Sequence, residues 1–401
     1  MAQPEIKTVA SQAQPRIRFD RNEFSGAFGD IGTDFPLIVG MILAAKLDPA
    51  GVLILFGAMQ VLTGLRYGIP MPAQPLKAMA AIVITQKLSG NILYGGGLAI
   101  GLVMLFLAAT GLIDAVARAV PKPVVRGIQF GLGLQLARLA LEQYLPTEGV
   151  IGYALGALAF VMIVWLLGNR RFPPAPLVIL LGITYALFYR IDARALLGGV
   201  GVALPRLHVP ARQDIFAGLV LLALPQIPLS IANSILATRQ IANDLFPERR
   251  ISVRTISFTY AAMNLINPFF GGIPTCHGSG GMAGHYAFGG RTGGSVVIYG
   301  FLYLLLGFFF SGSFEQVIHF FPKPVLGMIL FFEALTLLVL IRDITESRAD
   351  LSVTLLVGLA AVSLPFGYVI GLVLGTVLAW LVKRRLTGLV EGEPGDRGTG
   401  D

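Results

Sequence analysis

Two stretches rich in glycine and proline contain most of the side chains in this sequence that could bind a ligand. The first is 67-YGIPMPAQPLKAMAAIVITQ-86 and the second is 271-GGIPTCHGSGGMAGHYAFGGRTGG-294. Proline lacks a backbone N–H group and disfavours helix in the residue before it, so we expect each stretch to be extended at first and helical afterwards. A helix N-terminus carries a partial positive charge and unpaired N–H groups. Two such ends that meet would form an anion site.

Neutral hydrogen-bond donors lie near both predicted helix starts, and a lysine lies near the first. A third segment, 224-LPQIPLSIANSILATRQ-240, adds amide and hydroxyl groups in an apolar setting. Amide, hydroxyl and ammonium groups can donate hydrogen bonds to an oxyanion or to its water shell. The predicted substrate-binding residues are Gln74, Leu76, Lys77, Gln226, Asn233, Thr275, Cys276, His277, Gly278 and Ser279, some of them through backbone N–H groups.

Each of these features also has a purely structural explanation. Glycine in a membrane helix often allows close helix packing, which would explain Gly280 and Gly284 but not the whole run that begins at Pro274. Lys77 could bind the substrate, pair with a carboxylate or extend its ammonium to the membrane surface. A buried, hydrogen-bonded histidine explains His277 better than a metal site, because the sequence has one cysteine and no His-Glu-x-x-His string. We therefore predict an anion site without a metal or another cofactor.

Two aspartates in the first apolar segment are candidates for proton coupling. Asp30 and Asp34 are four residues apart, so on a continuous helix they share one face and Asp34 lies near the middle of the membrane. Carboxylates within a membrane are unfavourable and usually mark an ion or proton path. Alternatively, one of them pairs with Lys77 or Arg126 and only holds the helices together. Glu333 could equally be a proton-binding group or a hydrogen-bonding partner between helices.

The composition indicates a membrane protein. Of 401 residues, 55% are hydrophobic and 13% are charged, and the mean hydropathy is +0.75. A soluble domain has roughly twice that charged fraction. Apolar runs such as 351–382 are too long for a surface in contact with water. Soluble enzymes, nucleic-acid-binding proteins and disordered scaffolds are thereby excluded, and the fold class is an all-α polytopic membrane protein in a lipid bilayer.

Glycine, proline and basic residues divide the chain into about 14 predicted spans, of which the first lies near 24–46, the eighth near 213–238 and the tenth near 273–289. The net charge is +8, and the basic residues concentrate in alternate loops, which by the positive-inside rule puts both termini in the cytoplasm. We therefore expect a multi-pass protein of the cell (inner) membrane with cytoplasmic tails at 1–23 and 384–401. The N-terminal 24 residues lack an apolar signal-peptide core, so we expect the first span to direct insertion.

The two halves of the sequence resemble each other. Pro121-Lys122-Pro123-Val124 recurs as Pro322-Lys323-Pro324-Val325, and Gly68-Ile69-Pro70 recurs as Gly272-Ile273-Pro274, both about 200 residues apart. Because seven is an odd number, seven spans in each half would give the second half the opposite orientation in the membrane. We therefore predict inverted repeats at 24–190 and 213–383, a plan in which paired broken helices form the substrate site. The alternative is that proline and glycine merely recur at helix starts.

Four strings resemble the molybdate transporter family, a branch of the sulfate permease superfamily. They are 28-FGDIGTDFPL-37, 70-PMPAQPLKAMAA-81, 224-LPQIPLSIANSILAT-238 and 274-PTCHGSGGMAGHYAFGGRTG-293. The resemblance implies a fold of 7+7 inverted repeats shared with the uracil/proton symporters. It also implies a core domain at 24–113 and 213–311 that moves against a gate domain at 123–190 and 324–383. Many sulfate permeases add a soluble C-terminal regulatory domain, which we do not expect in this chain.

Nucleobase carriers of the same fold supply the main alternative substrate. They resemble one another in having carboxylates in the eighth and tenth spans, where this sequence has Gln226, Asn233, Cys276 and His277. A site rich in neutral donors favours an oxyanion. We therefore predict a secondary active transporter of a tetrahedral oxyanion, molybdate first and sulfate second, by alternating access and with proton symport as a hypothesis. A passive anion channel is a further alternative, an enzyme is not expected, and a homodimer is possible.

Overall fold

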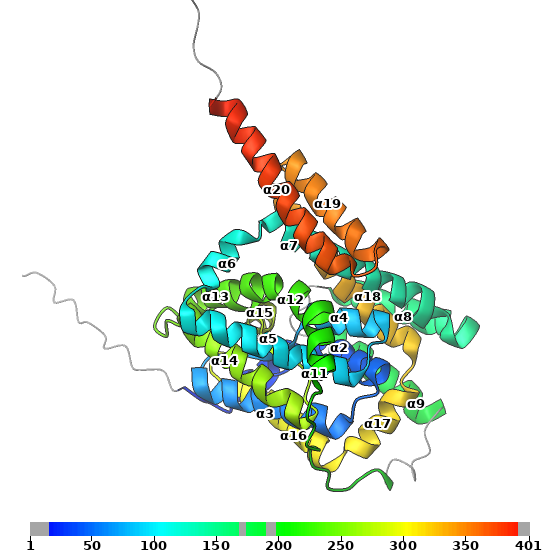
Figure 1. Ribbon diagram of the computed structural model, residues 1–401. Coiled ribbons are helices and arrows are strands. Elements are labelled where there is room, and N and C mark those ends of the chain that lie inside the picture. Colours follow the sequence, from blue (N-terminus) through cyan, green and yellow to red (C-terminus); the bar gives the residue numbers. More distant parts are fainter. Residues whose placement is uncertain (1–15, 168–173, 190–197, 392–401) are drawn as a thin grey trace, which may run out of the picture.

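The structure is a computed structural model that describes residues 16–167, 174–189 and 198–391 (Figure 1). The outer parts of the predicted tails, 1–15 and 392–401, therefore lie outside the described residues. The elements of the first half are α1 (Arg21–Gly26), α2 (Ile31–Ala45), α3 (Pro49–Tyr67), β1 (Ala73–Pro75), α4 (Lys77–Gln86), α5 (Gly90–Thr110), α6 (Ile113–Ala119), α7 (Lys122–Arg138), η1 (Leu139–Tyr144), η2 (Leu145–Glu148), α8 (Gly149–Leu166) and α9 (Pro174–Tyr189).

The second half repeats this order closely. Its elements are α11 (Arg212–Gly218), η3 (Leu219–Ala223), α12 (Leu224–Leu229), η4 (Ser230–Ala237), α13 (Thr238–Leu245), α14 (Val253–Ile266), η5 (Asn267–Phe270), β2 (Thr275–His277), α15 (Ser279–Ala287), α16 (Gly294–Phe309), α17 (Ser311–Phe320), α18 (Lys323–Val339), η6 (Leu340–Ile344), α19 (Arg348–Ser363) and α20 (Gly367–Glu391). Helices α7 and α18 both begin at the repeated Pro-Lys-Pro string, where proline fits the first turn of a helix.

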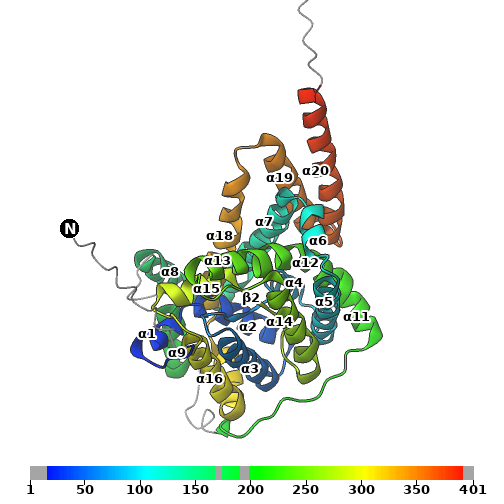
Figure 2. The same ribbon diagram turned by 90° about the vertical axis from the view of Figure 1, so that its left-hand side faces the viewer.

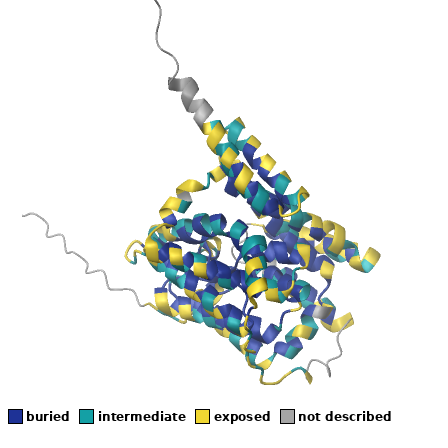
Figure 3. Ribbon diagram, in the orientation of Figure 1, coloured by how far each residue is buried: buried dark blue, intermediate teal, exposed yellow. Residues whose placement is uncertain are grey.

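The helices pack in two groups. In one group α3 lies along α16, α5 lies along α11 and α14, and α2 contacts α4. In the other, α7 contacts α18 and α19, while α19 packs on α20; α7, α19 and α20 project from the rest of the molecule (Figure 2). Contacts of α2 with α18 and of α4 with α7 join the groups. Buried residues concentrate in the first group and at this junction (Figure 3).

Several helices are long and apolar enough to cross a membrane. By length and composition there are five such segments among the described residues, or six if α16 and α17, which meet at 96°, count as one broken span. Helices α2 and α4 are apolar but shorter. The protein is therefore a helical membrane protein, whereas the number of 14 spans stays a prediction.

Two predicted spans differ from the structure. The first, expected to be continuous over 24–46, is interrupted between α1 and α2, because a turn at 27–30, which follows Gly26 and contains Gly29, ends one helix and Ile31 begins the next. The eighth, expected at 213–238, continues to Leu245 and contains two π-helical stretches, η3 and η4. Stretches of π-helix widen a helix locally and are common at functional sites. The fold also departs from purely helical structure in the three-residue strands β1 and β2.

Candidate functional site

Strands β1 and β2 bring the two predicted broken helices together. They pair antiparallel, with Gln74 opposite Cys276 and Pro75 opposite Thr275. The Leu76 amide donates to the Pro274 carbonyl at 3.1 Å. The short helices α4 and α15 follow the two strands directly. Because the strands are antiparallel and only three residues long, the two helices begin at opposite ends of the pair, a few residues apart. The prediction of extended segments leading into helices is confirmed at both places.

A cavity of about 180 Å³ lies beside these helix starts. Eight of the ten predicted substrate-binding residues line it, and Leu76 and Thr275 do not. The lining consists of Gln74, Lys77, Gln129, Gln226, Leu229, Asn233, Ser234, Cys276, His277, Gly278, Ser279, Gly280, Thr336, Leu337 and Leu340. No carboxylate is among them, and Lys77 is the one basic side chain apart from a histidine.

The N-terminus of α4 is already occupied by a protein group. The Gln226 side-chain oxygen accepts hydrogen bonds from the Ala78 and Met79 amides at 2.9 and 3.2 Å, so it caps this helix from a different part of the chain. The Gln226 amide nitrogen donates to the Ser230 hydroxyl at 3.1 Å. The amides of Leu76, Ala78 and Met79 are therefore already paired in this conformation, and a backbone contribution from the start of α4 stays a prediction for the Lys77 amide.

The N-terminus of α15 differs from that of α4. Gly278 precedes its first residue, and no side chain caps this helix start. Gly280 lines the cavity, and a Cβ atom built there would meet nothing within 4 Å. A Cβ atom at Gly284, by contrast, would collide with the backbone of Gly29. The close-packing explanation therefore applies to Gly284, whereas Gly280 leaves space at the cavity wall.

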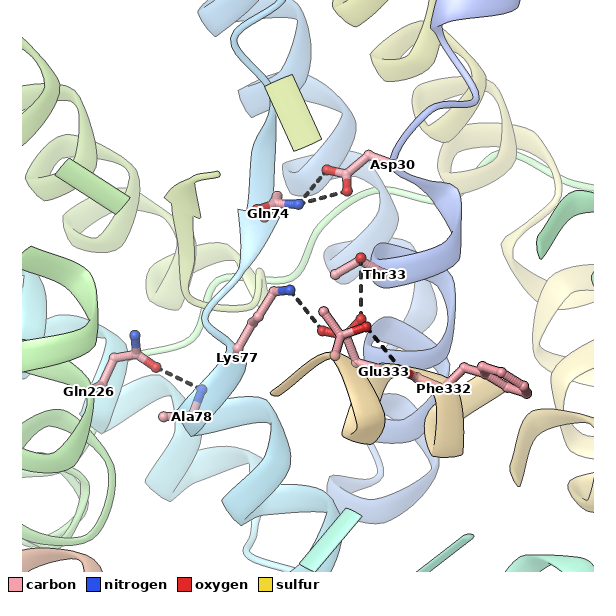
Figure 4. A network of polar contacts seen from close by, with 9 residues as sticks. Asp30, Thr33, Gln74, Lys77, Ala78, Gln226, Phe332 and Glu333 are labelled. Carbon is pink, nitrogen blue, oxygen red and sulfur yellow. Dashed lines mark hydrogen bonds and ion pairs between the residues drawn. The ribbon is translucent and has the colours of Figure 1, made fainter. Parts of the chain in front are cut away.

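Gln74 is hydrogen-bonded to Asp30, one of the two candidate proton-coupling residues. Its amide nitrogen donates to both carboxylate oxygens of Asp30, at 2.7 and 2.6 Å (Figure 4). The Gln74 oxygen lies against Gly278, where it occupies the position of a Cβ atom. Our prediction that Gln74 donates to the substrate is not met in this conformation, because its NH₂ group faces Asp30.

Asp34 faces a different partner. The Tyr299 hydroxyl donates to one of its carboxylate oxygens at 3.2 Å, and the other oxygen is buried without a hydrogen bond. Asp30 precedes α2 as its N-cap residue, and Asp34 lies in the first turn. Both side chains are almost completely buried, at 4% and 0% exposure. A buried carboxyl oxygen without a partner is unusual in proteins and is often found at functional sites.

The polar side-chain atoms of His277 and Thr275 bond to other protein groups. The His277 Nδ1 atom lies 3.4 Å from the Pro72 carbonyl oxygen and Nε2 lies 2.7 Å from the Thr259 hydroxyl. A carbonyl only accepts hydrogen bonds, so Nδ1 carries the proton and Nε2 accepts. The Thr275 hydroxyl accepts from Asn267 at 3.1 Å. Both side chains hold the strand, as the structural explanation of His277 predicts.

Lys77 pairs with a residue on α18. Its ammonium lies 2.7 Å from a Glu333 carboxylate oxygen, and the Thr33 hydroxyl lies 3.4 Å from the other oxygen (Figure 4). Arg126 pairs with Asp343 instead. The alternative in which Asp30 or Asp34 pairs with Lys77 or Arg126 is therefore wrong.

The sequence analysis missed several residues that line the cavity. Gln129 and Thr336 lie within long apolar helices, and their polarity inside a predicted span was the signal that could have identified them. Ser234, whose hydroxyl belongs to the donors expected in 224–240, lines the cavity next to Asn233 in η4. No three His, Cys, Asp or Glu side chains lie close enough to hold a metal ion in the described part of the chain. The assembled groups can bind an anion through Lys77, the start of α15 and neutral donors.

The sequence is similar to known transporters over most of its length. A family model described as a molybdate transporter of the MFS superfamily matches residues 22–136 and 218–337. Molybdate transporter 2 of Arabidopsis thaliana is 32% identical, over 91% of this chain and 88% of that protein. Molybdate transporter 1 of the same plant is 33% identical, over 89% of this chain and 87% of that protein. Molybdate transporter 1 of Chlamydomonas reinhardtii is 27% identical, over 88% of this chain and 90% of that protein.

Solved structures share the fold at low sequence identity. The transmembrane domain of a cyanobacterial bicarbonate transporter, BicA, superposes with a TM-score of 0.64 at 19% identity, over 90% of this chain and 98% of that chain. The murine anion transporter Slc26a9, in the inward-facing state, gives a TM-score of 0.69 at 13% identity, over 93% of this chain and 70% of that chain. At such identities the likeness concerns the fold alone.

Proposed function

This chain belongs to the molybdate transporter family, and we propose that it is a secondary active transporter of a tetrahedral oxyanion, molybdate first and sulfate second. The resemblance found in the sequence is thereby confirmed, and the family is one of transporters, not of enzymes. The observation that supports the substrate class best is the cavity at the uncapped start of α15, into which Lys77 brings a positive charge. Backbone N–H groups at a helix start and an ammonium group are suited to an oxyanion.

The cavity chemistry argues against a nucleobase. A base presents N–H groups, which need acceptors such as carboxylates, and no carboxylate lines the cavity. The Gln74 oxygen beside Gly278 is one acceptor, but Asp30 is turned to the Gln74 amide. An oxyanion accepts hydrogen bonds only, so it matches the donors of this site better.

Alternating access is supported by cavities at both ends of α4. The site cavity lies at its start, near Lys77. A second cavity of about 850 Å³ lies near its end, and its lining includes Lys46, Lys87 and Lys323. By the predicted orientation the second cavity faces outward, and its lysines would attract anions. We propose that the group of α2 to α5 and α11 to α16 forms the core that moves against the group of α7 to α9 and α18 to α20, as two inverted repeats.

Proton coupling through Asp30 or Asp34 is the mechanism that we propose for uphill transport. In proteoliposomes of the wild-type protein we expect molybdate to accumulate above its external concentration when the outside is more acidic than the inside. Asp34→Asn keeps the size of the side chain but cannot carry a charge, so we expect it to allow exchange and to abolish accumulation. Asp30→Asn is expected to do the same and also to loosen Gln74.

The control removes a carboxylate that lies outside the site. Glu142, in η1, forms an exposed ion pair with Arg138 at the end of α7. Glu142→Gln should accumulate molybdate as the wild type does. Accumulation that needs no pH gradient and survives both aspartate changes would contradict proton coupling at these residues. Equilibration without any accumulation in the wild type would instead indicate a passive channel.

A further inference from the structure

One ion pair in the site connects the two helix groups. Lys77 is the first residue of α4, and Glu333 lies in the middle of α18. Their charged atoms are 2.7 Å apart, and the Lys77 side chain keeps 31% of its surface exposed while Glu333 keeps 7%. Lys77 lines the cavity and Glu333 does not. The same ammonium group therefore borders the proposed substrate and, in this conformation, binds a carboxylate of the other helix group.

Carboxyl groups outnumber ammonium groups around Lys77. Asp30, Asp34 and Glu333 are carboxyl groups close enough to Lys77 to interact with it electrostatically. Arg126 and Lys122, the cations nearest along α7, both pair with Asp343. An oxyanion that enters the cavity thus finds one ammonium group that already has a carboxylate partner. Because the Glu333 side chain is only 7% exposed, water screens its charge weakly, and its repulsion opposes the binding of a second anion at Lys77.

We propose that Glu333 competes with the transported oxyanion for Lys77, so that it sets the affinity of the site and links its occupancy to the contact between α4 and α18. This inference rests on the proposed function. In the empty site Glu333 binds Lys77 and joins the two helix groups. When the oxyanion binds, the flexible lysine side chain turns into the cavity, and the ionic contact between the groups is released. Glu333 is therefore a positioning residue that does not touch the substrate.

The test compares Glu333→Gln with wild type in two measurements, calorimetric binding of molybdate and the turnover of molybdate transport in proteoliposomes. Glutamine has nearly the same size but no charge, so Lys77 becomes free for the anion. We expect the Kd for molybdate to fall by at least about fivefold. We also expect turnover to fall, because the contact that joins the groups in the empty carrier is lost. A merely destabilised protein would bind more weakly.

Two further variants make the outcome unambiguous. Glu333→Asp keeps the charge and should restore turnover in part, and Glu142→Gln removes the carboxylate of an exposed ion pair and should change neither quantity. Thermal unfolding of each purified variant shows whether it is folded. A Kd that is unchanged or raised in folded Glu333→Gln would overturn the competition. No molybdate binding by the wild type would overturn the proposed function itself, and this inference with it.

Discussion

Replacement of Lys77 by glutamine is expected to remove most of the affinity for the oxyanion. Lys77 is the one ammonium group at the cavity, and its removal leaves the substrate with neutral donors only. The loss of one partner from a desolvated charge pair weakens binding by about 2–5 kcal/mol, which is at least about 30-fold in Kd. Calorimetry with molybdate on the purified protein measures this change directly.

The single variant also leaves Glu333 buried without its cation, which can destabilise the fold. The double variant Lys77→Gln/Glu333→Gln removes both charges together and is expected to recover thermal stability while molybdate binding stays lost. Recovery of stability without binding separates the role of Lys77 as a ligand from its role in the ion pair. Wild-type affinity in the double variant would show that Lys77 does not contact the substrate.

A methyl group at Gly278 is expected to damage the site through Gln74. The Cβ atom of Gly278→Ala coincides with the Gln74 side-chain amide, so Gln74 must turn away from Asp30. Asp30 then loses two short hydrogen bonds inside the protein, which should lower the free energy of unfolding by about 2–3 kcal/mol. Thermal or denaturant unfolding of the purified variant measures the loss.

Gly280→Ala is the matched control, since the same methyl group there meets open space. Alanine also favours the helix over glycine by up to about 1 kcal/mol, so this variant should be at least as stable as the wild type. Equal stability of the two alanine variants would mean that the contact between Gln74 and Asp30 contributes nothing to the fold.

The broken helices could be predicted because local chemistry determines them. The clustered prolines and glycines of 67–75 and 271–278 disfavour helix, and the strands that precede both short helices follow from that pattern. The resemblance between the strings of the two halves placed these elements in one site. Hence eight of the ten predicted residues line the same cavity.

The hydrogen-bond partners could not be predicted in the same way. The sequence shows that Gln226 and Gln74 are polar residues in apolar surroundings, but not that one caps α4 and the other binds Asp30. Those contacts join residues that are far apart in the chain, and they depend on how the helices pack. The interruption before Ile31, unlike these contacts, could have been predicted locally. Gly26 and Gly29 indicate a break, and the prediction of a continuous helix over Asp30 did not take them into account.

The most direct test of an oxyanion at the start of α15 is calorimetric binding of molybdate to wild type and Gly280→Ala. The methyl group projects from the cavity wall without touching the protein, so it takes space from the anion alone. Overpacking of a filled site is unfavourable by about 1–3 kcal/mol, so we expect the Kd to rise about fivefold or more at unchanged thermal stability. Wild-type affinity in Gly280→Ala would contradict the account, because the anion would then bind elsewhere.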